Sequence, residues 1–192
     1  MMKGNSKNIS NWIKIIEPAF VFIGLQWFFK SVSVIAGLGN KANAVSSIIL
    51  FPIILFYFFR YSDRKKMNIP DIGKLLVVTV ILVVINQVIH RAVQYDVDSV
   101  SFLMFISSVF CGPVNEELIY RGILFERVMN QFGTLTAVFL SSVLFASAHG
   151  IGMLFPVSFL FGLVFGIIRT HWDTVAASTI VHIVLNLTTL IF

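Results

Sequence analysis

Charged residues are scarce in this chain. Asp, Glu, Lys and Arg together make up 12% of its 192 residues, whereas hydrophobic residues make up 57%. A typical soluble domain carries about 25% charged residues, so this composition excludes an ordinary water-soluble surface. The hydrophobic residues also occur in runs long enough to cross a bilayer. The composition therefore predicts an all-α, polytopic membrane helix bundle.

Cysteine is almost absent, since Cys111 is the single one. One cysteine excludes an intramolecular disulfide and a thiolate metal cluster. A Ser-, Gly- or Pro-rich linker is also lacking, which favours one bundle over two separate domains. The net charge of +5 does not indicate a nucleic-acid partner, because the basic residues lie beside hydrophobic segments, where they set membrane orientation.

The hydrophobic runs predict about eight transmembrane helices. We expect them at residues 13–38, 44–59, 75–93, 97–111, 114–130, 134–148, 153–168 and 174–192, with Gly112 and Pro113 as a break between the fourth and the fifth. The first run is long, is interrupted by Glu17 and lacks a cleavage site, so it predicts a retained span rather than a signal peptide.

The positive-inside rule predicts the orientation of these spans. The most basic joint, residues 60–66, indicates the cytoplasmic side, and the N-terminus then lies in the cytoplasm too. With eight spans, the last turn near His171 lies outside. Arg127, Arg169 and His171 then run against the charge rule on the outer side.

Two adjacent carboxylates and an arginine interrupt the apolar sequence at Glu116, Glu117 and Arg121. An ionisable residue at membrane depth costs roughly 2.5–3.5 kcal/mol on insertion scales, so it normally faces a bundle interior or a water-filled cavity. Glu117 precedes Arg121 by four residues, the favourable order for an ion pair within a helix. Glu116 points about 100° away around the helix and is freer to act on water.

Three later polar residues are expected at the depth of Glu116. If residues 114–130 and 134–149 form an antiparallel hairpin, Glu116 and His149 each lie about 24–26 Å from its turn. In the last helix, Asn186 lies roughly 22 Å from the preceding turn, and His182, four residues earlier, shares its face. The spacing thus predicts one layer of polar side chains, on the cytoplasmic side of the eight-span topology.

These residues fit hydrolysis by an activated water. Glu116, helped by His149, would deprotonate a water that attacks a peptide carbonyl, and His182 and Asn186 would donate hydrogen bonds to the oxyanion. Gly-x-Ser-x-Gly and His-Glu-x-x-His motifs are absent. Direct activation of water by Glu116 requires no cofactor. Glu116, His149 and His182 could instead hold a divalent metal such as zinc.

Three motifs in order resemble those of one family. Glu-Glu-x-x-x-Arg at 116–121, Phe-x-x-x-His at 145–149 and His-x-x-x-Asn at 182–186 resemble the motifs of the CAAX-protease and bacteriocin-processing (CPBP, also called Abi) intramembrane proteases. The likeness covers about residues 97–186. It implies a bundle of eight helices in which N-terminal helices occupy residues 1–96 and the catalytic core occupies residues 97–192.

The resemblance also implies roles for single residues. Glu116 corresponds to the catalytic glutamate and His149 to its helper, His182 and Asn186 correspond to an oxyanion pair, and Glu117 and Arg121 correspond to supporting residues. Eukaryotic members of the family trim prenylated CAAX proteins. Small bacterial members resemble factors for peptide or bacteriocin maturation and self-immunity, and this short chain fits that group better.

We therefore expect an intramembrane endopeptidase in a bacterial cell membrane, acting on membrane-associated or bacteriocin-like peptides. Three alternatives stay open. The first is a non-proteolytic bacteriocin self-immunity or scaffold protein, and the second is a small transporter whose buried Glu and His residues relay protons. In the third, the charged residues form a structural ion network while His182 and Asn186 link helices by hydrogen bonds.

Overall fold

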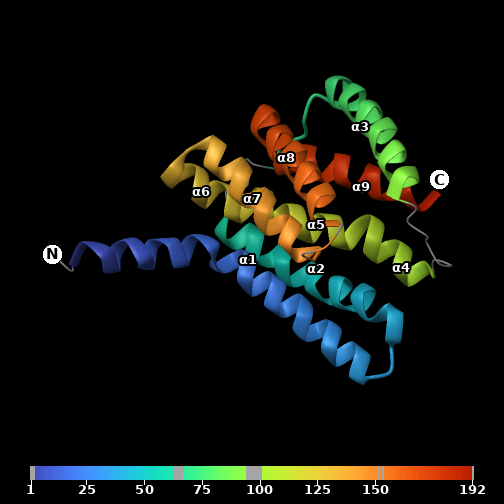
Figure 1. The fold of residues 1–192 in the computed structure, drawn as a ribbon, viewed down its shortest axis with the longest axis horizontal. Coiled ribbons are helices and arrows are strands. Elements are labelled where there is room, and N and C mark those ends of the chain that lie inside the picture. The colour runs from blue at the N-terminus through green and yellow to red at the C-terminus, as the bar shows by residue number, and fades with distance from the viewer. Residues whose placement is uncertain (1–2, 63–66, 94–100, 151, 153, 192) are drawn as a thin grey trace.

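The structure, a computed structural model, describes the chain except for residues 1–2, 63–66, 94–100, 151, 153 and 192. The described residues form helices and the short joints between them. The helices are α1 (Lys3–Ile35), η1 (Gly39–Lys41), α2 (Ala42–Tyr61), α3 (Ile72–Val93), α4 (Phe102–Ile106), η3 (Ser107–Cys111), α5 (Gly112–Glu117), η4 (Leu118–Leu124), α6 (Phe125–Phe132), α7 (Thr134–Ala148), α8 (Leu154–Trp172) and α9 (Val175–Ile191). They pack into the bundle seen in Figure 1.

Five of the described helical segments are long and apolar enough to cross a membrane. They are Trp12–Ile35, Ala42–Tyr61, Ile72–Ala92, Phe102–Phe132 and Leu154–Trp172. The helices α7 and α9 are apolar but shorter. The all-helical membrane bundle is thus confirmed, while the expected count of about eight spans is not.

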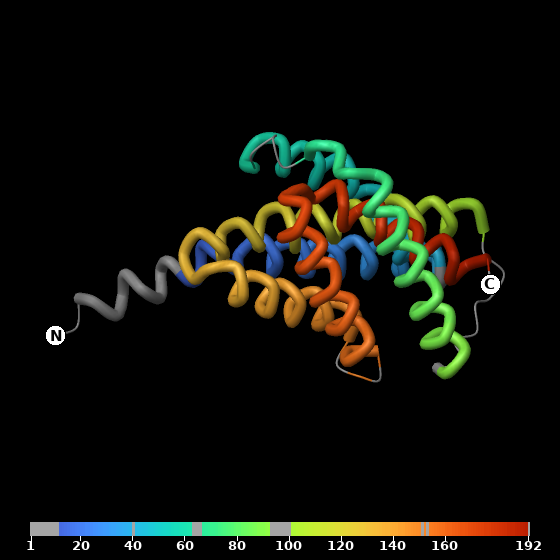
Figure 2. The backbone as a smooth tube through the Cα atoms, turned by 90° about the horizontal axis from the view of Figure 1, so that it is seen from above, coloured from blue at the N-terminus to red at the C-terminus, as the bar shows by residue number. Residues whose placement is uncertain are grey.

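The predicted break at Gly112 and Pro113 is wrong. Elements α4 to α6 follow one another as a single helical rod from Phe102 to Phe132, which Figure 2 shows as a continuous yellow-green to gold coil. A proline normally disturbs the hydrogen bond to the carbonyl four residues earlier. Here the preceding turn, η3, is a π-helix, and the Gly112 N–H donates to the Ser107 carbonyl five residues back. This wider turn lets the helix continue past Pro113.

The single rod changes the side of the bundle on which later turns lie. The hydroxyl of Thr174, between α8 and α9, donates to the Asn68 carbonyl, before α3, at 2.7 Å. The eight-span prediction put these two joints on opposite sides. That prediction is wrong because it counted one crossing too many in residues 97–130, of which 97–100 lie outside the described residues.

Other polar contacts gather at this same end. The Arg169 guanidinium donates to Glu126 at 3.2 Å, and the Ser62 hydroxyl donates to the other Glu126 oxygen at 3.4 Å. Arg127 donates to the Lys14 carbonyl. These contacts join α1, α2, α6 and α8, and we call this the basic end. Arg127, Arg169 and His171 thus share the side of the basic joint after α2, which removes their conflict with the charge rule.

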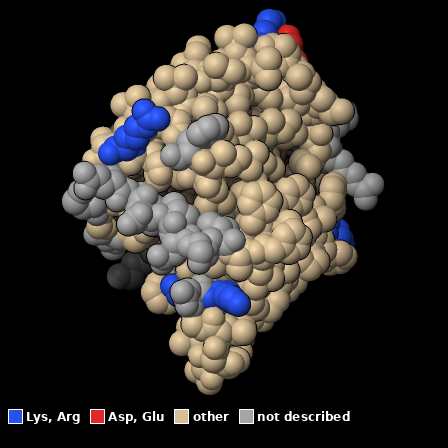
Figure 3. All heavy atoms as spheres, turned by 90° about the vertical axis from the view of Figure 1, so that its right-hand side faces the viewer, with Lys and Arg blue, Asp and Glu red and all other residues tan. Residues whose placement is uncertain are grey.

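The bundle exposes hydrophobic side chains around its flanks. In the face that Figure 3 shows, uncharged residues cover most of the surface and the charged ones lie near its rim. Large exposed side chains occur along α1, α2 and α3, such as Phe28, Phe56 and Leu76. Apolar surface of this extent suits contact with lipid rather than water.

A close approach between α2 and η4 sets a limit on residue size at Gly122. A Cβ atom at this position would lie 2.5 Å from Cε2 of Phe58, which is fully buried. We expect Gly122→Ala to lower the free energy of unfolding by about 1–3 kcal/mol, the usual cost of overpacking a core. Unfolding of the purified protein in a mixed detergent titration measures the change.

Gly24→Ala is the matched control for this prediction. Gly24 also lies inside a helix, but apart from the adjoining residues and the backbone of its own helix, no atom lies within 4 Å of the position that its Cβ would take. If both variants unfold at the same detergent composition as the wild type, the contact with Phe58 does not limit this position.

Candidate active site

The charged motif lies at the centre of the long rod, and its two supporting members are fully buried. Arg121 Nη1 lies 3.2 Å from Glu117 Oε1, and both side chains have an exposed fraction of 0%. The expected pair between these residues is therefore present. Arg121 Nη2 also donates to the Gly162 carbonyl of α8 at 3.1 Å, so the guanidinium links the rod to α8.

Aromatic rings enclose the Arg121 guanidinium. Its central carbon lies 4.4 Å from the centre of the Phe145 ring and 5.4 Å from that of Phe165. A cation above an aromatic face is attracted by the ring's negative π-surface, by about 2 kcal/mol or more where water is excluded. Phe145, the first residue of the second motif, thus packs the arginine of the first.

His182 lies between the two glutamates. Its Nδ1 atom is 3.1 Å from Glu117 Oε1, and its Nε2 atom is 3.9 Å from Glu116 Oε2. The first distance is a hydrogen bond and the second is too long for one. A carboxylate paired with Arg121 is an acceptor, so Nδ1 of His182 is the donor. The Phe165 ring stacks on His182 with centroids 4.6 Å apart, which fixes the plane of the imidazole.

The remaining motif residues lie around one small cavity of about 140 Å³. Its wall comes from α3, α7, α8 and α9 and from His149, directly after α7; the lining residues are Asn86, Phe145, His149, Ser158, Phe161, Phe165, His182, Leu185 and Asn186. His149 Nδ1 lies 2.9 Å from the Phe145 carbonyl, which can only accept a hydrogen bond, so Nε2 is left for other contacts. One amide hydrogen of Asn186 goes to the Ser108 carbonyl at 2.8 Å.

Glu116 differs from Glu117 in its surroundings. Its side chain keeps an exposed fraction of 14%, whereas Glu117 is fully buried. Among the contacts of the described residues, the histidine beside Glu116 is His182 rather than the expected helper His149. The structure thus brings Glu116, Glu117, Arg121 and His182 together directly, while His149 and Asn186 share the cavity with His182.

Two polar residues that the motifs did not indicate support this arrangement. Arg169 of α8 is almost fully buried and donates through Nε to the Arg121 carbonyl at 3.2 Å. Asn86 of α3 donates to the Thr189 hydroxyl at 2.8 Å and to the Leu185 carbonyl at 3.4 Å. In the sequence, Arg169 and Asn86 could have been recognised only as polar residues inside apolar runs.

The candidate metal ligands were also compared with the geometry. In the part of the chain that the structure describes, no group of three or more His, Cys, Asp and Glu side chains is arranged to hold a metal ion. The set Glu116, His149 and His182 is not such a group. Both histidines contact the Phe145 ring, but in the described contacts His182 is the one that approaches the glutamates.

The role of Asn86 is open to a direct comparison with its neighbour. Asn86 lines the cavity, whereas Gln87 donates to the Thr188 carbonyl of α9 at 2.9 Å without lining it. Each amide therefore ties α3 to α9 by the same kind of bond. We expect Asn86→Leu to raise KM for a cleaved peptide at least several-fold more than Gln87→Leu does, as steady-state kinetics would show. Equal effects of the two substitutions on KM would show that Asn86 only links α3 to α9 and does not contribute to substrate binding.

The fold and the site together define a polytopic α-helical membrane protein with a buried carboxylate, arginine and histidine cluster beside a small cavity. Residues 98–188 match the family model of the type II CAAX prenyl endopeptidase Rce1-like proteins. This segment, nearly half of the chain, is thus similar to the CPBP family, and that similarity suggests an intramembrane endopeptidase. Comparisons with curated proteins and with solved structures gave no match.

Proposed function

We propose that this protein is an intramembrane endopeptidase that hydrolyses peptide bonds of membrane-associated or bacteriocin-like peptides with a water activated by Glu116. The observation that carries the proposal is the placement of His182 between a fully buried, arginine-paired Glu117 and a partly exposed Glu116, at the wall of a cavity. One carboxylate is thereby held in place, and the other is left to accept a proton.

Glu116 serves as the general base in this mechanism. It takes a proton from a water molecule while the water oxygen attacks the carbonyl carbon of the scissile peptide bond. His149, with Nε2 left for contacts in the cavity, helps to orient this water. The proton later passes to the leaving amine, so that one peptide bond and one water yield a carboxylate and an amine.

His182 and Asn186 stabilise the oxyanion that forms on the attacked carbonyl. His182 donates through Nε2 while Nδ1 donates to Glu117, which requires the doubly protonated ring, and two nearby carboxylates supply the compensating charge. Asn186 has two amide hydrogens and spends one on Ser108, so the second is left for the oxyanion. Glu117 and Arg121 act as positioning residues for His182.

The test is cleavage by the purified, liposome-reconstituted protein. A mixture of synthetic peptides, with and without a prenylated C-terminal cysteine, is incubated with the wild type and analysed by mass spectrometry. We expect specific cleavage products that are absent with Glu116→Gln and that persist in the presence of a chelator. Loss of cleavage with chelator, restored by added zinc, would replace direct activation by Glu116 with metal catalysis at Glu116, His149 and His182.

An absence of specific products would overturn the protease proposal. In that case the self-immunity or scaffold function would account for the fold, and the buried ion cluster would be structural.

A further inference from the structure

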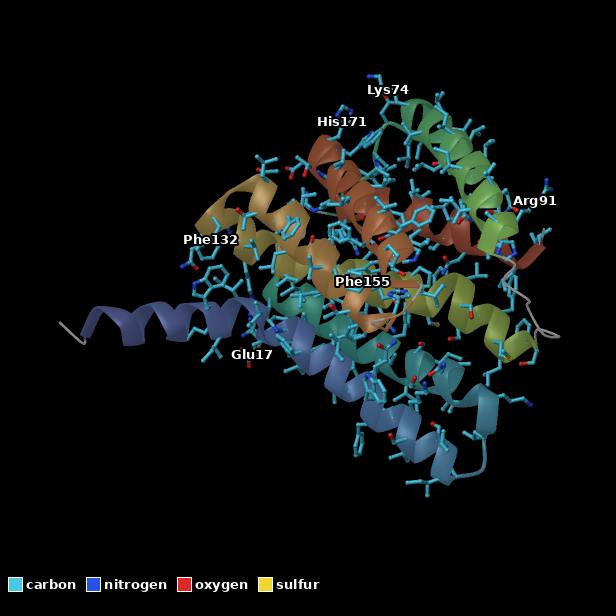
Figure 4. All side chains as sticks on the ribbon, viewed as in Figure 1. Glu17, Lys74, Arg91, Phe132, Phe155 and His171 are labelled. Atoms are coloured by element: carbon cyan, nitrogen blue, oxygen red, sulfur yellow. The ribbon has the colours of Figure 1, made fainter. Side chains whose placement is uncertain are left out.

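Basic residues are more numerous at one end of the bundle than at the other. The described lysines and arginines at the basic end are Lys14, Arg60, Lys74, Arg127 and Arg169, whereas those at the opposite end are Lys30, Lys41 and Arg91. In Figure 4, Lys74 and Arg91 mark the two ends of α3, and His171 at the end of α8 lies at the Lys74 end. The sequence adds Arg64, Lys65 and Lys66 to the joint between α2 and α3.

The unequal number of basic residues at the two ends indicates how the bundle is oriented in the membrane. Joints rich in lysine and arginine stay on the cytoplasmic side. In the eight-span topology, Arg127, Arg169 and His171 conflict with this rule. The contacts of Glu126 and Thr174 place them at the same end as the basic joint after α2, so the conflict disappears. The basic end is therefore the cytoplasmic end.

The cavity lies far from that end. The turn between α6 and α7 belongs to the basic end, and α7 has 15 residues, so His149 lies about 22 Å along the helix from this turn. The hydrocarbon core is about 30 Å thick, which places His149 beyond its middle. His149 is exposed although it lies at this depth. The short α7 therefore ends at this depth, where His149 lines the cavity.

We propose that the cavity opens toward the non-cytoplasmic side, and that its substrate is a peptide segment already exported to that side. The orientation stands on the charge distribution and on helix lengths, while the substrate class rests on the proposed protease function. This orientation replaces the cytoplasmic placement of the polar layer that the eight-span topology predicts. The phenyl rings of Phe145, Phe161 and Phe165 in the wall suit apolar side chains of an exported, membrane-bound peptide.

Thiol labelling tests the orientation without any need for activity. The only cysteine, Cys111, is buried and is replaced by Ala, and single cysteines are then introduced as Gly152→Cys, in the α7–α8 joint, and Gln131→Cys, at the basic end. Gly152 has open space where a side chain would go, and Gln131 is exposed. We expect a membrane-impermeant maleimide to label Gly152→Cys on intact spheroplasts, and Gln131→Cys only after permeabilisation. The reverse pattern would overturn the proposal.

A second experiment tests the substrate class. One peptide that the reconstituted wild type cleaves is fused to a single-span anchor so that it is presented either outside or inside, and each fusion is co-expressed with the wild type or with Glu116→Gln. We expect cleavage of the outside fusion by the wild type alone. Cleavage of only the inside fusion would overturn the exported-substrate proposal and leave the protease function standing, whereas failure of the protease function itself appears as a lack of products from the peptide mixture.

Discussion

Glu116→Gln is expected to lower the rate of peptide cleavage by about 10²–10⁴-fold, the usual contribution of a general base. Glutamine keeps the shape of the side chain but loses the oxygen charge that accepts the proton from water. Among the described residues, the Glu116 side chain forms no hydrogen bond and approaches His182 only to 3.9 Å, so the fold should be retained. Initial rates of product formation, measured by mass spectrometry with a cleaved peptide, give the change.

Glu117→Gln, measured in the same assay, distinguishes a loss of catalysis from a loss of stability. Glu117 holds both Arg121 and His182, so its loss should lower both the free energy of unfolding and the rate. Glu116→Gln should affect the rate alone. If Glu116→Gln cleaves at the wild-type rate, another group activates the water and the proposed mechanism is wrong.

Arg121→Met is expected to lower the free energy of unfolding by about 3–5 kcal/mol, because it leaves a buried carboxylate without its partner. The side chains of Arg121 and Glu117 are both fully buried, and the guanidinium also holds the Gly162 carbonyl. Unfolding by detergent titration, followed by the fluorescence of the tryptophans, measures the change. We also expect the rate of cleavage to fall, since Arg121 then no longer fixes the carboxylate to which His182 donates.

The double variant Arg121→Met with Glu117→Gln is the control for this prediction. Removing both charges of a buried pair is often close to neutral, so the double variant should recover most of the lost stability but not the activity. A double variant as unstable as Arg121→Met alone would show that the loss comes from packing against Phe145 rather than from the unpaired carboxylate.

The site also draws on helices outside the family segment. Asn86 lies on α3, before residue 98 where the family match begins, yet it lines the cavity together with motif residues. Ser47 of α2 likewise accepts a hydrogen bond at 2.8 Å from Asn115, which directly precedes the two glutamates. The N-terminal helices therefore help to position the site.

Several features of this protein could be predicted from the sequence alone. The membrane class follows from composition, because hydrophobic transfer depends on residue type and run length. The turns after Phe132 and Trp172 follow from local signals, such as Gly133, which adopts φ +83°. The pairing of Glu117 with Arg121 and the common face of His182 and Asn186 follow from helical periodicity, which is also local.

The tertiary structure decided the remaining features. Continuity of the rod through Pro113 depended on a π-helical turn, and periodicity alone does not distinguish such a turn from a break. The proximity of His182, rather than His149, to Glu116 depends on how α9 packs against the rod. The end of the bundle at which each joint lies depends on contacts between residues far apart in sequence, such as Thr174 with Asn68. Local patterns set which residues share a helix face, but only packing between helices sets which faces meet.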